Sequence, residues 1–353
     1  MQSFIESIVF HGRPDGVWRD HAGIVERHHF VQTIANLRHF GRDFSAEKSY
    51  IWPTMKSERL LIWLGFALIS TVWGTTWLAI RIGLESIPPF YAAAVRCLLA
   101  AVVLYAILRI TGSRIPATRL AWRVYLALGV LTIAIPFALI YWGQQFIPTG
   151  LSSILFGAFP FWVALLSHMM LPGERLNGFK IAAVILGFAG VALIFSADVH
   201  LSDENAFLGM IAVLVSTFLQ ALALIYIKKY GQDVSPTAMN FVGMAMGGAL
   251  LLLLSVALES GKPAIWSASG IISLLYLSLV GSVLTFVTYY WLLKRIEAVY
   301  LSLSSFINPL VAVAIGAVVL GERLPSSVFT GAALVLLGMI IANGKALYAK
   351  AFS

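Results

Sequence analysis

The sequence predicts an all-α membrane protein of ten transmembrane helices, arranged as two inverted five-helix repeats. Composition gives the fold class, because 59% of the 353 residues are hydrophobic and only 11% are charged, whereas soluble domains are about 25% charged. Ten long apolar runs give the number of helices. A set of residues that recurs after 148 or 149 positions predicts the duplication.

The ten apolar runs each have the length of a membrane-spanning helix, which is about 20 residues. They are too long for strands, and the alternating pattern of a membrane β-barrel is missing. A helix satisfies its own backbone polar groups, so it is the structure that lipid favours. The runs cover residues 60–82, 90–110, 122–142, 150–171, 179–197, 207–227, 237–258, 267–292, 300–320 and 326–345.

The N-terminal segment differs from the rest of the chain. Residues 1–54 hold five of the seven histidines and no run long enough to cross a membrane, and they lack the apolar core of a signal peptide. Translation from Met55, with a mis-assigned leader or loose tail before it, is one interpretation, and a metal-sensing or regulatory tail is the other. The histidine spacing matches no zinc pattern, which favours the first. The expected division is a leader or cytosolic tail over 1–56, repeats over 57–198 and 199–346, and a cytosolic C-terminal tail over 347–353.

The distribution of Lys and Arg predicts the orientation of the chain, because these residues accumulate in cytosolic loops. With the N-terminus in the cytosol, twelve of them follow the first span on the cytosolic side, against Arg81, Lys262 and Arg323 on the other. Both termini are therefore expected in the cytosol, in a multi-pass protein of the inner or plasma membrane. The net charge of +8 then belongs to cytosolic loops and indicates no nucleic-acid partner.

The tetrapeptide Gly-Glu-Arg-Leu occurs twice, and other residues repeat in register with it, which indicates a duplicated unit. A unit of five spans is odd, so its second copy enters the bilayer from the opposite side. Inverted repeats of this kind place a substrate site near the bilayer midplane between the halves; a duplication retained only for folding is the alternative. The matched residues are Glu174 and Glu322, Pro160 and Pro309, and the Tyr-Trp pairs at 141–142 and 290–291.

Several segments carry a family resemblance. They are STVWGTTWLAIRIGL (70–84), PPFYAAAVRCLLAAVVL (88–104), GAFPFWVALL (157–166), GERLNGFKIAAVILGFAGVAL (173–193) and SSFINPLVAVAIGAVVLGERLPSSVFTGAALVLLG (304–338). Through them, residues 57–345 resemble the ten-span EamA-type members of the drug/metabolite transporter superfamily. The resemblance implies a ten-helix fold with a central cavity between two halves, often with export as the direction. It leaves the substrate open, since relatives handle amino acids, purines, sugars, polyamines and drugs.

Polar residues inside the spans are the first candidates for a site, because buried charge in a membrane is expensive and usually functional. Arg96 lies about two turns into the second span and could hold a substrate carboxylate. Bonds to backbone carbonyls, or snorkelling to the outer interface, are equally open. Gln220 in the sixth span is a candidate for hydrogen bonds to a substrate or to another helix. His168 fits an interfacial structural role better than a proton relay.

Matched interruptions of two spans are the second pointer to a site. Pro160 and Pro309 each remove a helical hydrogen bond and predict a kink, with a packing role as the alternative. Trp73 lies about fourteen residues into its span and is expected to line a cavity, whereas the Tyr-Trp pairs are expected to be interfacial anchors. The predicted substrate-binding residues are Trp73, Thr76, Arg96, Phe159, Pro160, Gln220, Asn308 and Pro309.

Missing motifs exclude other classes. Every acid after residue 59 lies in a loop or at a span end, so export of cationic drugs coupled to an embedded carboxylate is disfavoured. The sequence has no phosphate loop and no catalytic or metal motif, so no cofactor, no metal and no enzymatic activity are expected.

The function expected from the sequence is export of a small polar metabolite, an amino acid or a related compound, by alternating access. A receptor or scaffold without flux and a lipid-handling flippase are the alternatives. The expected partners are a small-molecule substrate and the lipid bilayer, and a homodimer is possible.

Overall fold

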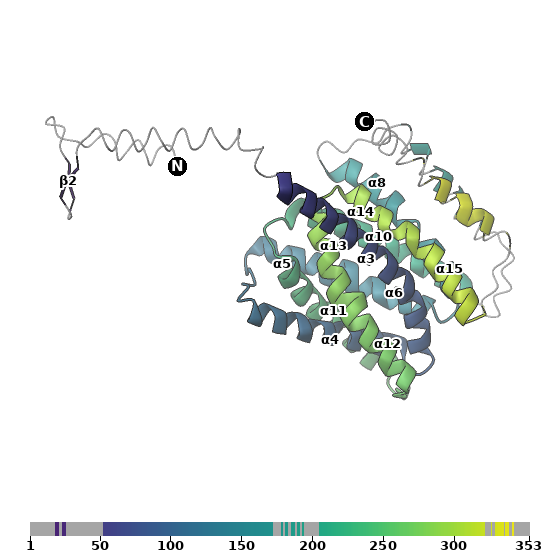
Figure 1. Ribbon diagram of the computed structural model, residues 1–353. Coiled ribbons are helices and arrows are strands. Elements are labelled where there is room, and N and C mark those ends of the chain that lie inside the picture. The colour runs from purple at the N-terminus through teal and green to yellow at the C-terminus, as the bar shows by residue number, and fades with distance from the viewer. Residues whose placement is uncertain are drawn as a thin grey trace. The chain divides into compact units, whose positions relative to one another are not determined.

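The computed structural model describes residues 18–20, 23–25, 52–171 and 205–321, with scattered residues between 178 and 193 and between 326 and 341. By internal contacts the chain divides into Met1–Ile62 and Trp63–Ser353. The first unit contains a two-stranded antiparallel hairpin, β1 (Trp18–Asp20) and β2 (Gly23–Val25), which the sequence did not predict. The described part of the second unit is helical (Figure 1), as its composition predicts.

Within the described residues, seven helical segments are long and apolar enough to cross a membrane. Their ends lie within about three residues of seven predicted runs, because proline and small polar residues mark helix ends clearly in this sequence. The segments are Leu60–Leu84 of α3 (Trp52–Leu84), α4 (Pro89–Ile110), Arg119–Gly143, Thr149–Met170, α10 (Ala206–Tyr230), α11 (Pro236–Leu258) and Ala268–Leu293.

The remaining predicted runs are described only in part. The ninth contains α14 (Ala298–Ser302), a 3₁₀ segment η4 (Leu303–Phe306) and α15 (Ile307–Val319). The fifth and tenth runs, and the two Gly-Glu-Arg-Leu copies except for Gly321, lie largely outside the described residues.

Helix starts follow from local sequence. Ser235 accepts a hydrogen bond from the Ala238 backbone N–H at the start of α11. Thr118 accepts one from Ala121 in the same way. A hydroxyl at this position satisfies one of the free N–H groups of the first turn, and the proline that opens α4 and α11 loses no hydrogen bond there.

Two spans are interrupted by π-helical segments at matching positions. The third contains α5 (Arg119–Leu126), η2 (Ala127–Ala134) and α6 (Ile135–Gly143). The eighth contains α12 (Ala268–Ser278), η3 (Leu279–Leu284) and α13 (Thr285–Leu293). π-Helical turns free backbone carbonyls and frequently occur at functional sites.

The breaks predicted at Pro160 and Pro309 are observed. A proline ring clashes with the carbonyl four residues earlier, and α7 (Thr149–Phe156) ends four residues before Pro160, with α8 (Phe159–Met170) beginning after a turn. In the ninth span the residue four before Pro309 is Ser305, and it lies in the 3₁₀ segment η4 that interrupts the α-helix. The interruptions before Pro160 and Pro309 therefore recur at the spacing of the predicted repeat.

Helices α4 and α11 run antiparallel to each other. Tyr105, near the end of α4, packs on Phe241, near the start of α11, with ring centroids 5.3 Å apart. At the other end, Glu259 after α11 contacts the backbone of Phe90 at the start of α4. The second and seventh predicted spans, which correspond in the predicted repeat, therefore point in opposite directions.

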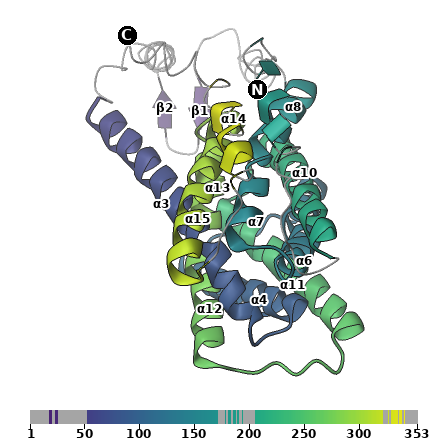
Figure 2. The same ribbon diagram turned by 90° about the vertical axis from the view of Figure 1, so that its right-hand side faces the viewer.

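The other helix pairs continue this pattern. Gly65 lies against Thr288 and Gly83 lies against Ser273, so α3 is antiparallel to the span that contains α12 and α13. The span that ends with α6 packs on α10, and α7 and α8 pack on α15 and α14; Figure 2 shows α7 between α15 and α10. These four pairings map onto themselves when each described span is exchanged with the one five spans along.

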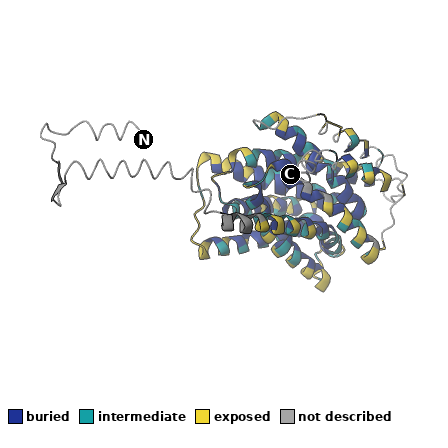
Figure 3. Cartoon of the chain, turned by 45° about the horizontal axis from the view of Figure 1, so that its top comes forward, coloured by how far each residue is buried: buried dark blue, intermediate teal, exposed yellow. Residues whose placement is uncertain are grey.

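Glycines let helices of the two halves approach closely. A Cβ atom on Gly247 would lie 2.6 Å from Ile133 Cγ2 and 2.8 Å from the Gly129 carbonyl oxygen, distances that real side chains do not reach. Gly143 and Gly209 meet backbone to backbone in the same way. Such contacts drive helix association in lipid. Exposed residues lie on the outward faces of the helices (Figure 3), and many of them are large and apolar, which suits a lipid environment.

One buried carboxylate joins the ends of α11 and α4. Glu259 is 5% exposed, and its two oxygens accept hydrogen bonds of 2.9 Å from the backbone N–H groups of Phe90 and Tyr91. These N–H groups have no partner within their own helix, and the helix dipole favours negative charge there. Glu259 therefore caps α4 from a distant part of the chain.

We expect Glu259→Ala to lower the free energy of unfolding by about 2 kcal/mol, because two buried N–H groups lose a charged acceptor. Thermal unfolding of the detergent-solubilised protein measures the effect, and Glu259→Gln, which keeps one acceptor oxygen, should lose less. An unchanged midpoint in Glu259→Ala would show that the cap does not stabilise the fold.

Candidate functional site

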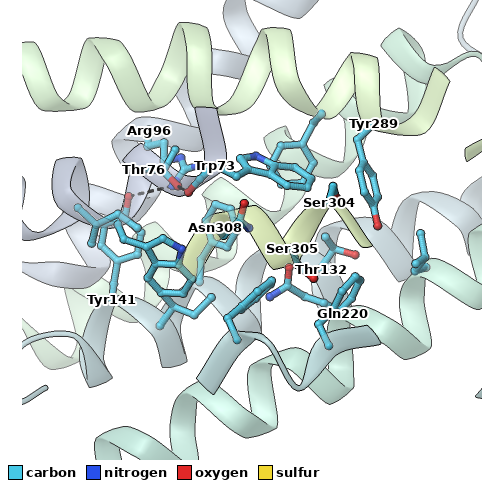
Figure 4. A pocket seen from close by; sticks show the side chains of 18 of the residues that line it. Trp73, Thr76, Arg96, Thr132, Tyr141, Gln220, Tyr289, Ser304, Ser305 and Asn308 are labelled. Atoms are coloured by element: carbon cyan, nitrogen blue, oxygen red, sulfur yellow. Dashed lines mark hydrogen bonds between the residues drawn. The ribbon is translucent and has the colours of Figure 1, made fainter. Parts of the chain in front are cut away.

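A cavity lies between helices of the two predicted repeats (Figure 4). The wall is mainly aromatic, with a few polar groups that converge on it. The lining residues are Trp73, Thr76, Trp77, Ile80, Arg96, Thr132, Phe137, Ile140, Tyr141, Phe156, Phe159, Gln220, Leu224, Phe286, Tyr289, Tyr290, Ser304, Ser305 and Asn308.

Most of the residues predicted from sequence meet at this cavity. Pro160 and Pro309 are buried but do not line it; they break the helices whose neighbouring residues do. That the lining residues bind a substrate stays a prediction. The predicted residues in the wall are Trp73, Thr76, Arg96, Phe159, Gln220 and Asn308.

Arg96 is fully inside the protein, only 4% exposed, so the interpretation that it snorkels to the interface was wrong. Its Nε donates to Ser282 Oγ at 2.9 Å, and its two terminal nitrogens donate to the Gly281 carbonyl at 3.2 Å and the Tyr141 hydroxyl at 3.3 Å. Its guanidinium also lies over the Phe137 ring, 4.7 Å from the centroid.

The charge of Arg96 has no counter-ion among the described residues. A guanidinium has five N–H donors, and the three bonds above leave two for another partner. No Asp or Glu is found in the described wall of the cavity. The Gly281 carbonyl belongs to η3 and also accepts from Thr285 Oγ1 at 2.8 Å, so Arg96 partly satisfies a carbonyl in the π-helical segment and partly faces the cavity.

An amide donor and an amide acceptor in the wall lack partners. Gln220 Nε2 and Asn308 Oδ1 are buried and make no hydrogen bond within the described structure, although a buried polar atom without a partner costs about 1–3 kcal/mol. Asn308 is 2% exposed, and Figure 4 shows both amides in the cavity wall. A ligand with its own donor and acceptor would satisfy both atoms.

Three hydroxyl groups of the wall, those of Thr76, Ser304 and Ser305, can only accept. Ser305 Oγ donates to the Ser302 carbonyl at 2.6 Å and Ser304 Oγ donates to the Leu301 carbonyl at 2.8 Å. Thr76 Oγ1 donates to the Trp73 carbonyl at 2.7 Å. Because each hydroxyl proton is used within its own helix, these oxygens offer lone pairs to a ligand.

Aromatic rings enclose the space between the polar groups. Trp73 packs against Phe286 and Tyr289, with centroids 5.5 and 4.9 Å away. Phe156 stacks on Phe159 at 5.6 Å. Such a wall suits the apolar body of a small molecule, and its ring faces can also stabilise a positive charge.

Two wall residues were assigned wrongly from the sequence. Tyr141 and Tyr290 were expected to anchor span ends at the membrane interface, but they are 1% and 2% exposed and line the cavity, together with Tyr289. The repeat contained a signal, because Tyr141 and Tyr290 correspond to each other. The neighbouring Trp142 and Trp291 are half-buried and lie outside the wall.

Other candidates do not contribute to the cavity. His168 lies exposed in the last turn of α8 and is absent from the wall. Among the described residues, no group of three or more His, Cys, Asp or Glu side chains is arranged to hold a metal ion. The five histidines of the N-terminal segment lie outside the described residues.

Comparisons with known proteins agree with the architecture. The model of the EamA-like transporter family matches residues 61–196 and again residues 207–344. The chain is 28% identical over 280 residues to an uncharacterised transporter, YoaV, of Bacillus subtilis, covering 79% of this chain and 96% of YoaV. It is 26% identical over 298 residues to YedA, an uncharacterised inner membrane transporter of Escherichia coli K12, covering 83% and 95%.

A solved crystal structure shares the fold. It superposes with a TM-score of 0.62 at 20% identity, covering 80% of this chain and 96% of that one.

Two nearby serines should respond differently to a large substitution. Ser305 lines the cavity, whereas Ser302 is fully buried and does not line it. Ser305→Phe should place its ring in empty space and leave the thermal unfolding midpoint nearly unchanged. Ser302→Phe should overpack the interior and lower stability by about 1–3 kcal/mol or more. Equal destabilisation of the two variants would mean that no such space exists.

Proposed function

Because the chain belongs to the EamA-like transporter family and is a multi-pass membrane transporter rather than an enzyme, we propose that it exports a small polar metabolite that carries a carboxylate. An amino acid or a related compound fits best. The substrate would bind in the cavity and cross by alternating access, outward over an inner or plasma membrane. Export is the direction that the family resemblance favours.

The observation that carries this proposal is the buried charge of Arg96. An isolated cation in a low-dielectric interior is costly, and the neutral oxygens of Ser282, Gly281 and Tyr141 compensate it only in part. A carboxylate can accept two parallel hydrogen bonds from one guanidinium. A substrate carboxylate would therefore use the two free donors and neutralise the charge while the substrate is bound.

The other wall residues suit a substrate whose part beyond the carboxylate is positively charged or neutral. Asn308 Oδ1 and the oxygens of Ser304 and Ser305 can accept hydrogen bonds from an amino group, and aromatic ring faces attract a positive charge. Gln220 Nε2 can donate to a carbonyl or hydroxyl. A purely cationic drug would be repelled by Arg96 and would find no Asp or Glu in the described wall. Cationic drugs are therefore disfavoured as substrates.

Two inverted five-span repeats would supply the alternating access. Three observations support them: the family model matches the chain twice, corresponding helices run antiparallel, and the interruptions recur at the repeat spacing. In such folds the two halves rock around a site at their interface. The proposed protein has ten spans, with both termini in the cytosol.

Uptake into proteoliposomes tests the function. Purified protein is reconstituted into vesicles loaded with one unlabelled compound, and uptake of the same compound in labelled form is measured. The panel comprises amino acids, nucleobases and organic acids. Saturable counterflow of at least one carboxylate is expected. Binding without flux would identify a receptor, and movement of labelled phospholipid alone would identify a flippase.

Arg96→Ala should weaken apparent affinity for carboxylate substrates by about 10- to 100-fold, the loss of a hydrogen bond to a charged group. Neutral substrates of the same size should be affected far less. Arg96→Lys, which keeps the charge but not the paired geometry, should be intermediate. Equal loss for both substrate classes would assign Arg96 to structure alone.

The inverted arrangement predicts opposite locations for the two Gly-Glu-Arg-Leu turns. Single cysteines near Glu174 and Glu322, in a Cys97→Ala background, should react with an impermeant thiol reagent from opposite faces of the membrane. Reaction of both from the same face would overturn the inverted repeat.

A further inference from the structure

A cationic side chain ties the end of α3 to the end of α6. Arg81 lies in the last turn of α3, and its terminal nitrogen donates to the carbonyl oxygens of Gln144 at 2.9 Å and Gln145 at 3.3 Å. Gln144 returns a bond of 2.7 Å from its Nε2 to the Trp77 carbonyl. Because α6 ends at Gly143, Arg81 caps the C-terminus of the third span.

A second cation makes the equivalent tie between α10 and α13. Lys228 lies in the last turn of α10, and its Nζ donates to the carbonyl oxygens of Leu293 at 2.5 Å and Ile296 at 2.7 Å. Lys294 returns a bond to the Gln232 carbonyl. Because α13 ends at Leu293, Lys228 caps the C-terminus of the eighth span.

The two ties correspond to each other in the repeat. Arg81 and Lys228 are 147 positions apart, and Gln144 and Leu293 are 149 apart. The free carbonyls and the negative end of the dipole at a helix C-terminus favour a cation in both places. We define the contacts of Arg81 and Gln144 as the Arg81 tie, and those of Lys228 and Lys294 as the Lys228 tie.

The ties lie at opposite ends of the bundle. The end of α3 meets the start of α12, where Ser86 Oγ and Ser267 Oγ are 2.9 Å apart, and α12 and α13 belong to one span that runs antiparallel to α3. The Lys228 tie lies at the other end of that span. The two ties therefore face opposite sides of the membrane.

Each tie lies beyond the last cavity-lining residue of its helix. In α3, Trp77 and Ile80 line the cavity, and Arg81 follows directly after Ile80. Leu224 lines the cavity and Lys228 follows it by four residues in α10. Neither cation is in the wall itself, and both are half-buried. They are therefore placed between the cavity and the two ends of the bundle.

We propose that the Arg81 tie and the Lys228 tie are the two gates of the cavity, one for each face of the membrane. Both are formed in this structure, and each transport cycle breaks one while the other stays closed. This proposal rests on the alternating access proposed above. Arg81 and Lys228 are positioning residues: they hold helix ends together and do not touch the substrate.

Side-specific labelling tests the gates. The reporter is Ser305→Cys in the cavity wall of a Cys97→Ala background, reacted with an impermeant thiol reagent applied to either face of oriented vesicles. Arg81→Gln should raise the labelling rate from one face, the external face in the predicted orientation. Lys228→Gln should raise it from the other. Each increase should be about tenfold, the change that loss of one hydrogen bond to a charged group gives.

A second variant of each tie distinguishes loss of the tie from misfolding of a single variant. Gln144→Leu removes the returning bond of the Arg81 tie and should raise labelling from the same face as Arg81→Gln. Lys294→Gln should act on the same face as Lys228→Gln. Lys229→Gln, next to Lys228 but packed over the Tyr230 ring, and Lys262→Gln, exposed after α11, are controls that should change neither rate.

The outcomes separate the two proposals. Rates that rise from the same face in both sets of variants, or that rise in neither, overturn the gates. If the background protein shows counterflow while the gate variants leave both labelling rates unchanged, the proposed transport is supported and the proposed gates are wrong. A reporter that no reagent reaches from either face in any variant, in protein without counterflow, overturns both.

Discussion

The fold is organised around one guanidinium in a low-dielectric interior. Arg96 projects from α4 and bonds Ser282 and Gly281 of the π-helical segment η3 as well as Tyr141 of α6, so one side chain links three spans. A charge in that position has to be compensated by hydrogen bonds and by bound ligands. The helix interruption that frees the Gly281 carbonyl and the cavity proposed to admit a carboxylate would therefore both compensate the burial of this charge.

Helix interruptions supply the other polar groups of the cavity. Lipid tolerates unpaired backbone groups only where protein or a cavity covers them, and the breaks before Pro160 and Pro309 lie in such places. The same breaks bring Phe159, Ser304 and Asn308 into the wall. An unbroken helix would present one stripe of side chains to the interior, whereas a broken one presents several orientations within a few residues. The helix breaks before Pro160 and Pro309 thus help to form the cavity wall.

The sequence predicted the described helices well because their ends are local features, a proline or a hydroxyl-bearing cap. It also located Arg96, Gln220 and Asn308, since polar residues stand out in apolar spans. It failed for Tyr141 and Tyr290, because a π-helical turn shifts the face that a span presents and periodicity alone does not show this. The partners of Glu259 and Lys228 lie far away in the chain, so only the fold reveals what those charges do.

The two predicted repeats carry a symmetric pair of ties but line the cavity asymmetrically. Seven residues after its first proline, α4 has Arg96, whereas α11 has Gly243 at the corresponding position. A Cβ atom there would lie 2.6 Å from Leu128 Cδ2, so close packing on η2 leaves no room for a second guanidinium. In the proposed transport cycle the cavity has to open and close toward each side of the membrane, which favours two similar gates. The proposed substrate binds through one carboxylate and needs one anion site, so a single Arg96 would give it one orientation between the two predicted repeats.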